Sequence, residues 1–270
     1  MDMLFTNEHS DLKVYVSLTS IFQKQDSLVQ TLESIKSQKY QIDKCYIYLS
    51  EESYLIDEGF FEKKITNDNL KKFLDTNSDI FEVVWTENIG SYRKLIPLLK
   101  AKMKENCIII TVDDDSTYDP NMINNYLDEF FIHDCCIAGR CYTMSFDDIS
   151  KVTYDQSQKE VPKYLYNFHT GKGGVLYHPK FFSKTKKHIV NKKLFESNCK
   201  TADDVWFNFH RIANKIECKI TKNYCIKDLT QNHSLFMNIN HHIDKNTGES
   251  YNTNAMRSVV KTLLELGYKL

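Results

Sequence analysis

The chain has 270 residues, of which 41% are hydrophobic and 26% are charged, a balance typical of a globular protein with a proper core. Its formal net charge of −1 argues against bulk attraction to nucleic acid or to an anionic membrane. We therefore expect no nucleic-acid partner, and no apolar run approaches the roughly 20 residues needed to span a bilayer.

The first half of the chain alternates between strand and helix patterns. Strands are expected at residues 13–21, 45–50 and 81–85, with helices at 26–39 and 91–104 between them. Residues 53–79 are mixed and polar, which indicates a loop with a short helix. This rhythm predicts βαβ units and a mostly parallel, Rossmann-like central sheet flanked by helices.

The fourth expected strand ends in three carboxylates, Asp113, Asp114 and Asp115. Residues 108–112 are apolar without alternation, which predicts a strand buried on both faces. Asp119 and Pro120 then form the pattern of a helix start. The carboxylates should therefore lie at the carboxyl end of a central strand, where open α/β sheets bind their ligands.

Three adjacent carboxylates repel one another, and a bound cation relieves this repulsion. Oxygen ligands of this kind suit Mg²⁺ or Mn²⁺, and Mg²⁺ in particular is held by one or two carboxylates plus substrate phosphates. A solvated acidic turn that caps the next helix is the alternative. The apolar strand before the carboxylates and the helix start after them favour a metal–phosphate site.

The second half predicts further elements of the same domain. A helix at 120–131 leads to a strand at 136–142, and the glycine-rich residues 171–179 run into another short strand. A helix opens near residue 201 and a strand follows at 216–220. No linker composition divides the chain, so one domain is expected at residues 1–235.

The sequence contains eight cysteines, none of them in a C-x-x-C pair, and has no signal-peptide pattern. These features indicate reduced thiols in a cytosolic protein.

Residues 236–270 are expected to form a C-terminal extension with an amphipathic helix at 254–266. Its apolar side comprises Met256, Val259, Val260, Leu263 and Leu264. Such a face normally packs on its own domain. A second subunit or a membrane surface is the alternative partner.

Five features occur in order along the chain: the opening strand at 14–20, the Asn88-Ile-Gly-Ser-Tyr-Arg-Lys-Leu segment, the Asp-Asp-Asp signature, the Gly171-Lys-Gly-Gly-Val-Leu-Tyr segment and the Ala202-Asp-Asp-Val-Trp block. In these features, over roughly residues 12–235, the chain resembles bacterial family 2-like glycosyltransferases of the nucleotide-diphospho-sugar transferase (GT-A) fold. A D-x-D alone is weak evidence, whereas all five in this order are more specific.

The resemblance implies a donor site at the ends of the first two strands. Thr19 and Ser20, with Ser50 or Glu51, would hold the nucleobase and ribose. Lys94 would reach a phosphate or a carboxylate of the triplet, or is a solvated helix lysine. Of the triplet, Asp113 and Asp114 would face the donor, with Asp113 at the ribose, while Asp115 and Asp113 would hold Mn²⁺ or Mg²⁺.

The resemblance also implies roles in the second half of the chain. Asp204, with Asp203 beside it, would be the catalytic base that takes the proton of the acceptor hydroxyl. The alternative is that both acids only cap a helix. Gly173 and Gly174, in the same run as Gly171, would allow the backbone close to a bound sugar or would form a plain turn.

His233 would reach the metal or diphosphate, or is an ordinary surface histidine.

The expected activity is an inverting, metal-dependent transfer from a nucleotide-sugar, with UDP the nucleotide such folds often use. The acceptor would be a hydroxyl of a glycan or lipid-linked glycan of capsule or lipopolysaccharide type. The Q-x-x-R-W block of processive synthases is absent, so single additions are expected, in the cytoplasm or peripherally at the inner face of the membrane. The alternatives are a sugar-1-phosphate nucleotidyltransferase, disfavoured by the lack of glycine after the first strand, and a non-catalytic nucleotide-sugar-binding module.

Overall fold

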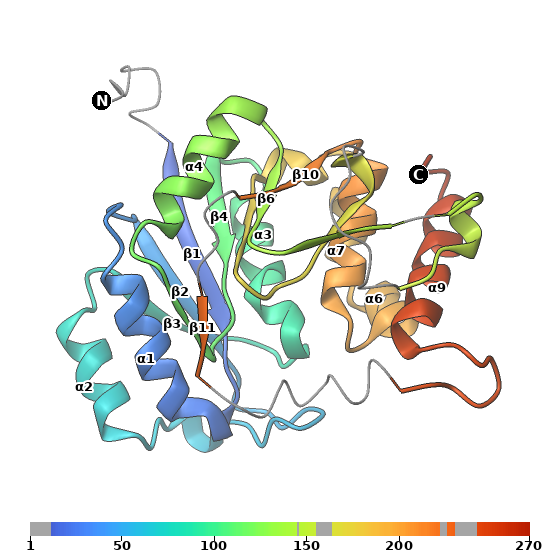
Figure 1. Cartoon of the computed structure of the whole chain (residues 1–270). Helices are drawn as coiled ribbons and strands as arrows, with labels where there is room; N and C mark the ends of the chain where they lie inside the picture. Colours follow the sequence, from blue (N-terminus) through green and yellow to red (C-terminus); the bar gives the residue numbers. More distant parts are fainter. Residues whose placement is uncertain (1–11, 145, 155–163, 222–225, 230–241) are drawn as a thin grey trace.

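A seven-stranded sheet forms the centre of the molecule, whose computed structural model describes residues 12–144, 146–154, 164–221, 226–229 and 242–270 (Figure 1). The strand order is β10-β6-β9-β4-β1-β2-β3. In chain order these strands are β1 (Lys13–Thr19), β2 (Lys44–Leu49), β3 (Phe81–Trp85), β4 (Cys107–Thr111), β6 (Cys136–Ala138), β9 (Val175–Tyr177) and β10 (Cys218–Ile220). β9 is antiparallel to β4 and β6, whereas the other pairs are parallel. The expected mostly parallel α/β architecture is confirmed.

Helices flank the sheet on both faces. They are α1 (Gln25–Lys36), α2 (Asp68–Thr76), α3 (Ile96–Lys102), α4 (Met122–His133), α5 (Lys186–Ile189), α6 (Lys192–Cys199), α7 (Asp203–Ala213) and α9 (Tyr251–Glu265). Figure 1 shows α1 and α2 on the near face of the sheet and α3 on the far face. The connections from β1 to β2 to β3 run one way along the sheet and the return to β4 runs the other way. Right-handed crossovers then require opposite faces.

The core of the sheet lies at β1 and β4. Every residue of β4 is buried, as expected for a strand covered on both faces. β1 and β4 run parallel, with Ser17 opposite Thr111. The segments that follow both strands therefore leave the sheet at the same edge, and this brings residues 19–24 beside the carboxylate triplet.

The chain makes a short strand directly after the triplet, before the next helix begins. This strand is β5 (Ser116–Tyr118), which pairs with β11 (Ile226–Asp228) in a small antiparallel sheet. The helix start expected at Asp119 and Pro120 is wrong, because α4 begins at Met122 without a side-chain cap. Asp119 instead closes a turn, since its Oδ1 accepts from the backbone N–H of Asn121 at 2.8 Å.

The strand expected at residues 136–142 is divided between two sheets. β6 belongs to the central sheet, whereas β7 (Cys141–Thr143) pairs with β8 (Asn167–His169). The backbone N–H of Gly139 still donates to Gly174 at the sheet, while the carbonyl of Arg140 already accepts from Thr170. The chain thus turns out of the sheet between these two residues and carries Arg140 towards the carboxylates.

The C-terminal helix α9 packs against α6 and α7. Met256, Val259, Val260 and Leu263 are buried there, whereas Leu264 is 44% exposed.

No helix in the described part of the chain is long and apolar enough to cross a membrane. The seven cysteines within the described ranges are all free and buried.

Candidate active site

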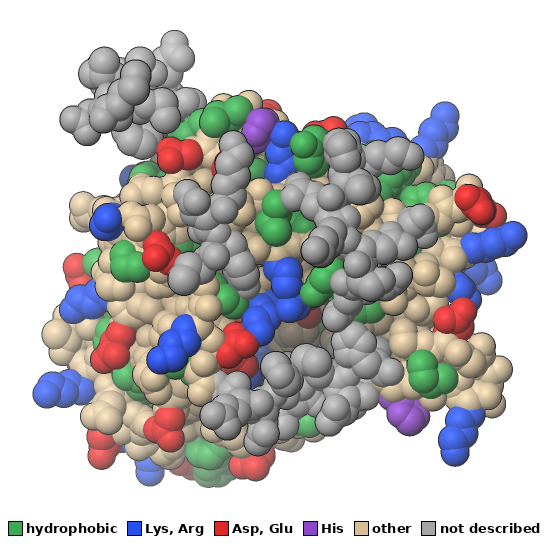
Figure 2. Space-filling model, in the orientation of Figure 1, with side chains coloured by type: hydrophobic (Ala, Val, Ile, Leu, Met, Phe, Trp, Pro, Cys, Tyr) green, Lys and Arg blue, Asp and Glu red, His purple; other side chains and the backbone are tan. Residues whose placement is uncertain are grey.

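A cleft of about 380 Å³ opens where the carboxyl ends of β1 and β4 meet the start of α7. Its volume lies in the range of small-molecule sites. Residues from all parts of the chain line it, including Thr19, Ser20, Lys24, Asp57, Arg93, Lys94, Asp113, Asp114, Asp115, Arg140, Tyr154, Gly171, Lys172, Asp203, Asp204, Asp228 and Asn252. In Figure 2 the hollow near the centre of the face has Lys and Arg side chains gathered beside it.

The carboxylate triplet forms one wall of the cleft and is held from several sides. Tyr118 holds the backbone of Asp113, because its hydroxyl accepts from the backbone N–H of Asp113 at 2.8 Å. Asp114 accepts from the hydroxyl of Ser20 at 2.6 Å. Burial raises the pKa of Asp114, although the nearby Lys24 opposes this shift. The loop that carries the triplet thus lies beside the end of β1.

Lys24 neutralises two of the three carboxylates. Its Nζ lies 2.8 Å from Oδ2 of Asp115 and 3.3 Å from Oδ1 of Asp114. Burial alone would lower the pKa of Lys24, but the two carboxylates outweigh it and raise the pKa. Sequence reasoning missed this lysine, which sits between the first strand and the first helix.

Lys94 links the triplet to the acidic pair of α7. The helix expected at residues 91–104 begins as a 3₁₀ turn, Gly90–Lys94, which places this side chain in the cleft. Its Nζ lies 3.1 Å from Asp113 and 3.2 Å from Asp203. Burial would lower the pKa of Lys94, but these carboxylates and Asp204 raise it well above its usual value. Lys94 is 8% exposed, so it is no solvated helix lysine.

Asp203 and Asp204 occupy the first turn of α7, where the helix dipole favours negative charge. Asp204 Oδ2 accepts from the backbone N–H of Gly171 at 3.0 Å. Neither residue makes a cap, because the N-cap position is Ala202 without a side-chain cap bond. Burial and the charge of Asp203 raise the pKa of Asp204 to about 7. A carboxyl group tuned in this way suits proton transfer near neutral pH.

Gly171 lies at the point where three functional groups converge. A Cβ at this position would be 2.8 Å from Nζ of Lys94, 3.3 Å from Oδ1 of Asp113 and 3.4 Å from Oδ1 of Asp204. Gly173 and Gly174, which were expected at the donor, are not among the residues that line the cleft. Both have positive φ and their carbonyls accept from the hydroxyl of Tyr126, so they shape the turn into β9.

The donor residues expected from the second strand lie apart from the cleft. Ser50 is fully buried and its hydroxyl accepts from the backbone N–H of Glu52. Glu51 is exposed and does not line the cleft. Asp57, a few residues further on, lines it instead. Its position in a mixed polar segment without periodicity carried no signal that sequence reasoning could use.

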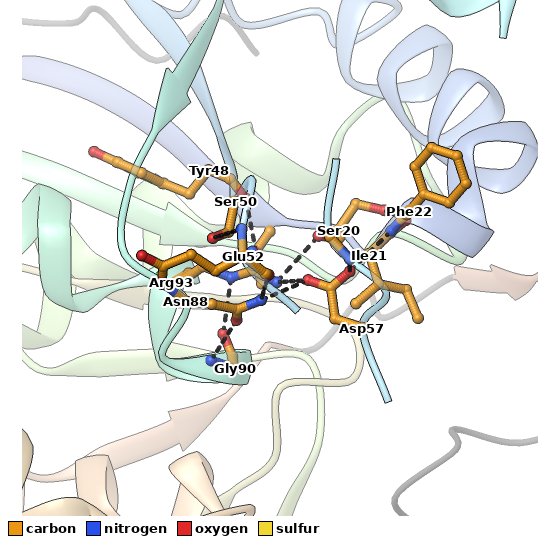
Figure 3. A network of polar contacts seen from close by, with 12 residues as sticks. Ser20, Ile21, Phe22, Tyr48, Ser50, Glu52, Asp57, Asn88, Gly90 and Arg93 are labelled. Carbon is orange, nitrogen blue, oxygen red and sulfur yellow. Dashed lines mark hydrogen bonds and ion pairs between the residues drawn. The ribbon is translucent and has the colours of Figure 1, made fainter. Parts of the chain in front are cut away.

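Asp57 is the centre of the polar network in Figure 3. Its Oδ2 accepts from Arg93 at 2.8 Å and from Asn88 at 2.9 Å, while Oδ1 accepts from the backbone N–H groups of Phe22 and Gly59. Arg93 also donates to the carbonyl of Ser20. The network links the loops after β1, β2 and β3 through hydrogen bonds and one ion pair. The Asn88 segment thus contributes Asn88 and Arg93 to this network and Lys94 to the carboxylates.

The other side of the cleft is built by the C-terminal half. Tyr154 and Asn252, the second from the first turn of α9, line this side. The backbone N–H of Tyr154 donates to the hydroxyl of Thr253, and its ring packs edge-on against Phe168. The tail of the chain thus contributes directly to the site. His233, expected as a metal ligand, lies outside the described residues.

The carboxylates near Asp115 suit a divalent cation. Of the five carboxylates in the triplet and α7, four form ion pairs with the ammonium groups of Lys24 and Lys94, whereas Asp204 is in none of the described ion pairs. Excess negative charge therefore remains. No three His, Cys, Asp or Glu side chains in the described ranges form a ready cage for a metal ion. This donor set fits an ion of the Mg²⁺ type, which takes one or two carboxylates and completes its shell with substrate phosphates and water.

Comparisons with known proteins place the fold but no family. No protein-family model matches the sequence, and no curated protein matches it. The crystal structure of S. aureus TarS 1-349 has a TM-score of 0.51 at 13% identity, covering 80% of this chain and 60% of that one. TarS 1-349 in complex with UDP has a TM-score of 0.50 at 12% identity, with the same coverage. A 4-diphosphocytidyl-2C-methyl-D-erythritol synthase from Anaerococcus prevotii has a TM-score of 0.48 at 16% identity. This chain therefore shares the fold of TarS and spans 60% of the length of that TarS fragment.

Proposed function

We propose that this chain transfers a sugar from a nucleotide-sugar, with UDP the first candidate, to an acceptor hydroxyl with inversion at the anomeric carbon. The observation that carries the proposal is the convergence of Asp113, Lys94 and Asp204 around Gly171 in one cleft. A diphosphate-binding wall and a carboxyl group of raised pKa thereby face one another. The fold shared with TarS, a protein whose structure was solved with UDP, supports the choice of donor.

The donor would lie along the wall that joins β1, β4 and the Asp57 network. Ser20 and Asp57 would border the nucleoside and Asp113 the ribose. Asp115, with Asp113, would hold Mn²⁺ or Mg²⁺, which when bound neutralises the diphosphate as it leaves. Lys94 already bridges Asp113 and Asp203, so it keeps these carboxylates at a fixed spacing.

Asp204 would act as the general base. Its carboxylate lines the same cleft as the triplet, and a Cβ on Gly171 would lie 3.4 Å from Oδ1 of Asp204 and 3.3 Å from Oδ1 of Asp113. In the transfer, the acceptor oxygen bonds to the anomeric carbon, the bond from that carbon to the diphosphate breaks, and Asp204 takes the hydroxyl proton. The backbone N–H of Gly171 holds one oxygen of this carboxylate, which leaves the other free to receive the proton.

The acceptor would enter beside Tyr154 and Asn252. An aromatic ring and an amide side chain are groups that can stack on and hydrogen-bond to a sugar. A surface glycan or lipid-linked glycan of capsule or lipopolysaccharide type stays the proposed acceptor class, and the cytoplasm or the inner membrane face the proposed location. Hydrolysis of a panel of nucleotide-sugars, with and without Mn²⁺, tests the donor. If no member releases nucleoside diphosphate and none binds in calorimetry, the proposal fails.

One observation favours a second candidate, a sugar-1-phosphate nucleotidyltransferase. Lys24 places a positive charge directly after the first strand, at the carboxylates, and a basic group in this loop could hold a triphosphate. The two reactions differ in their products. Incubation with a nucleoside triphosphate and a sugar-1-phosphate would release pyrophosphate, whereas sugar transfer releases a nucleoside diphosphate.

A further inference from the structure

Lys24 occupies the place beside Asp114 and Asp115 where a divalent cation would bind. Its Nζ is 2.8 Å from Oδ2 of Asp115 and 3.3 Å from Oδ1 of Asp114. The carboxylate of Asp115 is 18% exposed and the side chain of Lys24 is 21% exposed. Both groups therefore border the open cleft. The lysine supplies the counter-charge that the crowded carboxylates require.

An ammonium group and a divalent cation compete for the same carboxylate oxygens. Two positive charges within about 4 Å repel by several kcal/mol at the effective dielectric near a protein surface. The lysine side chain is a flexible four-carbon stem with a compact charge at its end. It can therefore move away from Asp115 without a change in the backbone.

The second lysine of the cleft differs in this respect. Lys94 is 8% exposed, bridges Asp113 and Asp203, and accepts a hydrogen bond on its carbonyl from Ser17 at 2.6 Å. It contacts neither Asp114 nor Asp115 in the described ion pairs. Lys94 is thus built into the wall of the site, whereas Lys24 lies at its rim and is the one free to exchange.

We propose that Lys24 is a positioning residue that holds Asp114 and Asp115 in the free protein, is displaced from Asp115 by the divalent cation, and then turns its ammonium towards the donor diphosphate. This inference rests on the proposed function. It implies that metal and donor bind cooperatively, because the lysine opposes the metal alone and attracts the diphosphate once displaced. Removal of the ammonium should therefore have opposite effects on the two affinities.

The test uses the full chain and Mn²⁺ binding followed by water-proton relaxation, first without nucleotide. Lys24→Gln should bind Mn²⁺ roughly tenfold more tightly than the wild type, a factor that corresponds to about 1.4 kcal/mol. Lys24→Arg keeps the charge and should stay within about threefold. Lys172→Gln is the matched control, because Lys172 lines the same cleft but pairs with Asp228. It should change the Mn²⁺ affinity by less than about threefold.

The second measurement is UDP binding by calorimetry at saturating Mn²⁺, where Lys24→Gln should bind roughly tenfold more weakly. A third needs no variant: acetylation of Lys24, followed by mass spectrometry, should become faster when Mg²⁺ is added, because an amine displaced from Asp115 is more accessible to the reagent than one that is 21% exposed. This third measurement decides the question if Lys24→Gln does not fold.

The outcomes separate the inference from the proposed function. If the wild type binds Mn²⁺ with UDP but Lys24→Gln leaves both affinities unchanged, and Mg²⁺ does not alter acetylation, the exchange is refuted and the proposed metal site stands. If neither the wild type nor Lys24→Gln binds Mn²⁺, with or without UDP, both ideas fail together.

Discussion

Replacement of Asp204 by Asn tests the chemical step most directly. The change keeps the shape of the side chain, and the Asn oxygen can still accept from the N–H of Gly171, which lies 3.0 Å from Asp204 Oδ2. It removes the carboxylate that is proposed to take the proton. Loss of a general base costs roughly 10²–10⁴-fold in turnover, which corresponds to about 2.7–5.4 kcal/mol in the activation barrier.

Donor affinity should change little in the same variant. Asp204 belongs to α7, whereas the proposed donor wall is formed by the triplet and the loops after β1, β2 and β3. We expect the affinity for a nucleotide-sugar to stay within about tenfold, so the loss falls on kcat and not on KM. Steady-state kinetics measures the loss of turnover, and calorimetry with donor in the absence of acceptor measures the donor affinity.

The pH profile gives a second measure of the same residue. Because the pKa of Asp204 is raised to about 7, the carboxyl group is protonated below that pH and cannot act as a base. Wild-type turnover should therefore rise as the pH passes through about 7 and level off above it. The remaining activity of Asp204→Asn should lack this step.

The folding stability of the wild type should fall over the pH range in which its turnover rises. A raised carboxyl pKa means that the folded protein binds the proton more tightly than the unfolded chain, so stability is lost as the pH rises from about 4, the ordinary value of the group, towards 7. Asp204→Asn removes this loss and should unfold at a higher temperature than the wild type at pH 8. Near-normal turnover in Asp204→Asn with an inactive Asp203→Asn would refute the assignment. If both variants stay active, neither residue is the base.

Three further predictions concern other parts of the molecule. Transfer should stop in EDTA and return with Mn²⁺ or Mg²⁺, and full activity in EDTA would contradict the metal role of Asp115. Gly171→Ala should keep the fold, since this glycine has no positive φ, but its Cβ would displace Lys94 and lower turnover roughly tenfold or more; unchanged kinetics would show that the spacing is uncritical. Leu263→Ala, at a fully buried position of α9, should cost about 2–5 kcal/mol in urea unfolding. Leu264→Ala, where the side chain is 44% exposed, should cost less than about 0.5 kcal/mol.

The sequence by itself determined the elements whose signal is local. The apolar run at 108–112 required a strand covered on both faces, and the three carboxylates after it then had to leave the sheet at its carboxyl edge. The alternation of strands and helices likewise predicted that β1 to β4 run parallel, which the structure confirms. Asp113 and Asp115 were candidates from the residue pattern, and Lys94 and Asp204 from the resemblance to glycosyltransferases; all four line one cleft.

Only the tertiary structure decided which distant groups meet. Asp57 and Lys24 stand in segments without periodicity, and their partners are Arg93 and Asp115, far along the chain. Hydrogen bonds and ion pairs between such residues have no characteristic spacing in the sequence, because only the tertiary fold brings the two residues together.

The same reason explains why Gly173 and Gly174 do not line the cleft as expected, and why the first turn of α9 lines it although the sequence did not predict this. Gly171, Gly173 and Gly174 look alike in sequence, but only Gly171 lines the cleft, since the other two bend the chain into an antiparallel β9. Strand direction depends on how the whole chain closes, which no local pattern records. Asn252 reaches the cleft because the apolar face of α9 is buried against α6 and α7, and amphipathicity specifies that a helix must be covered without specifying by what.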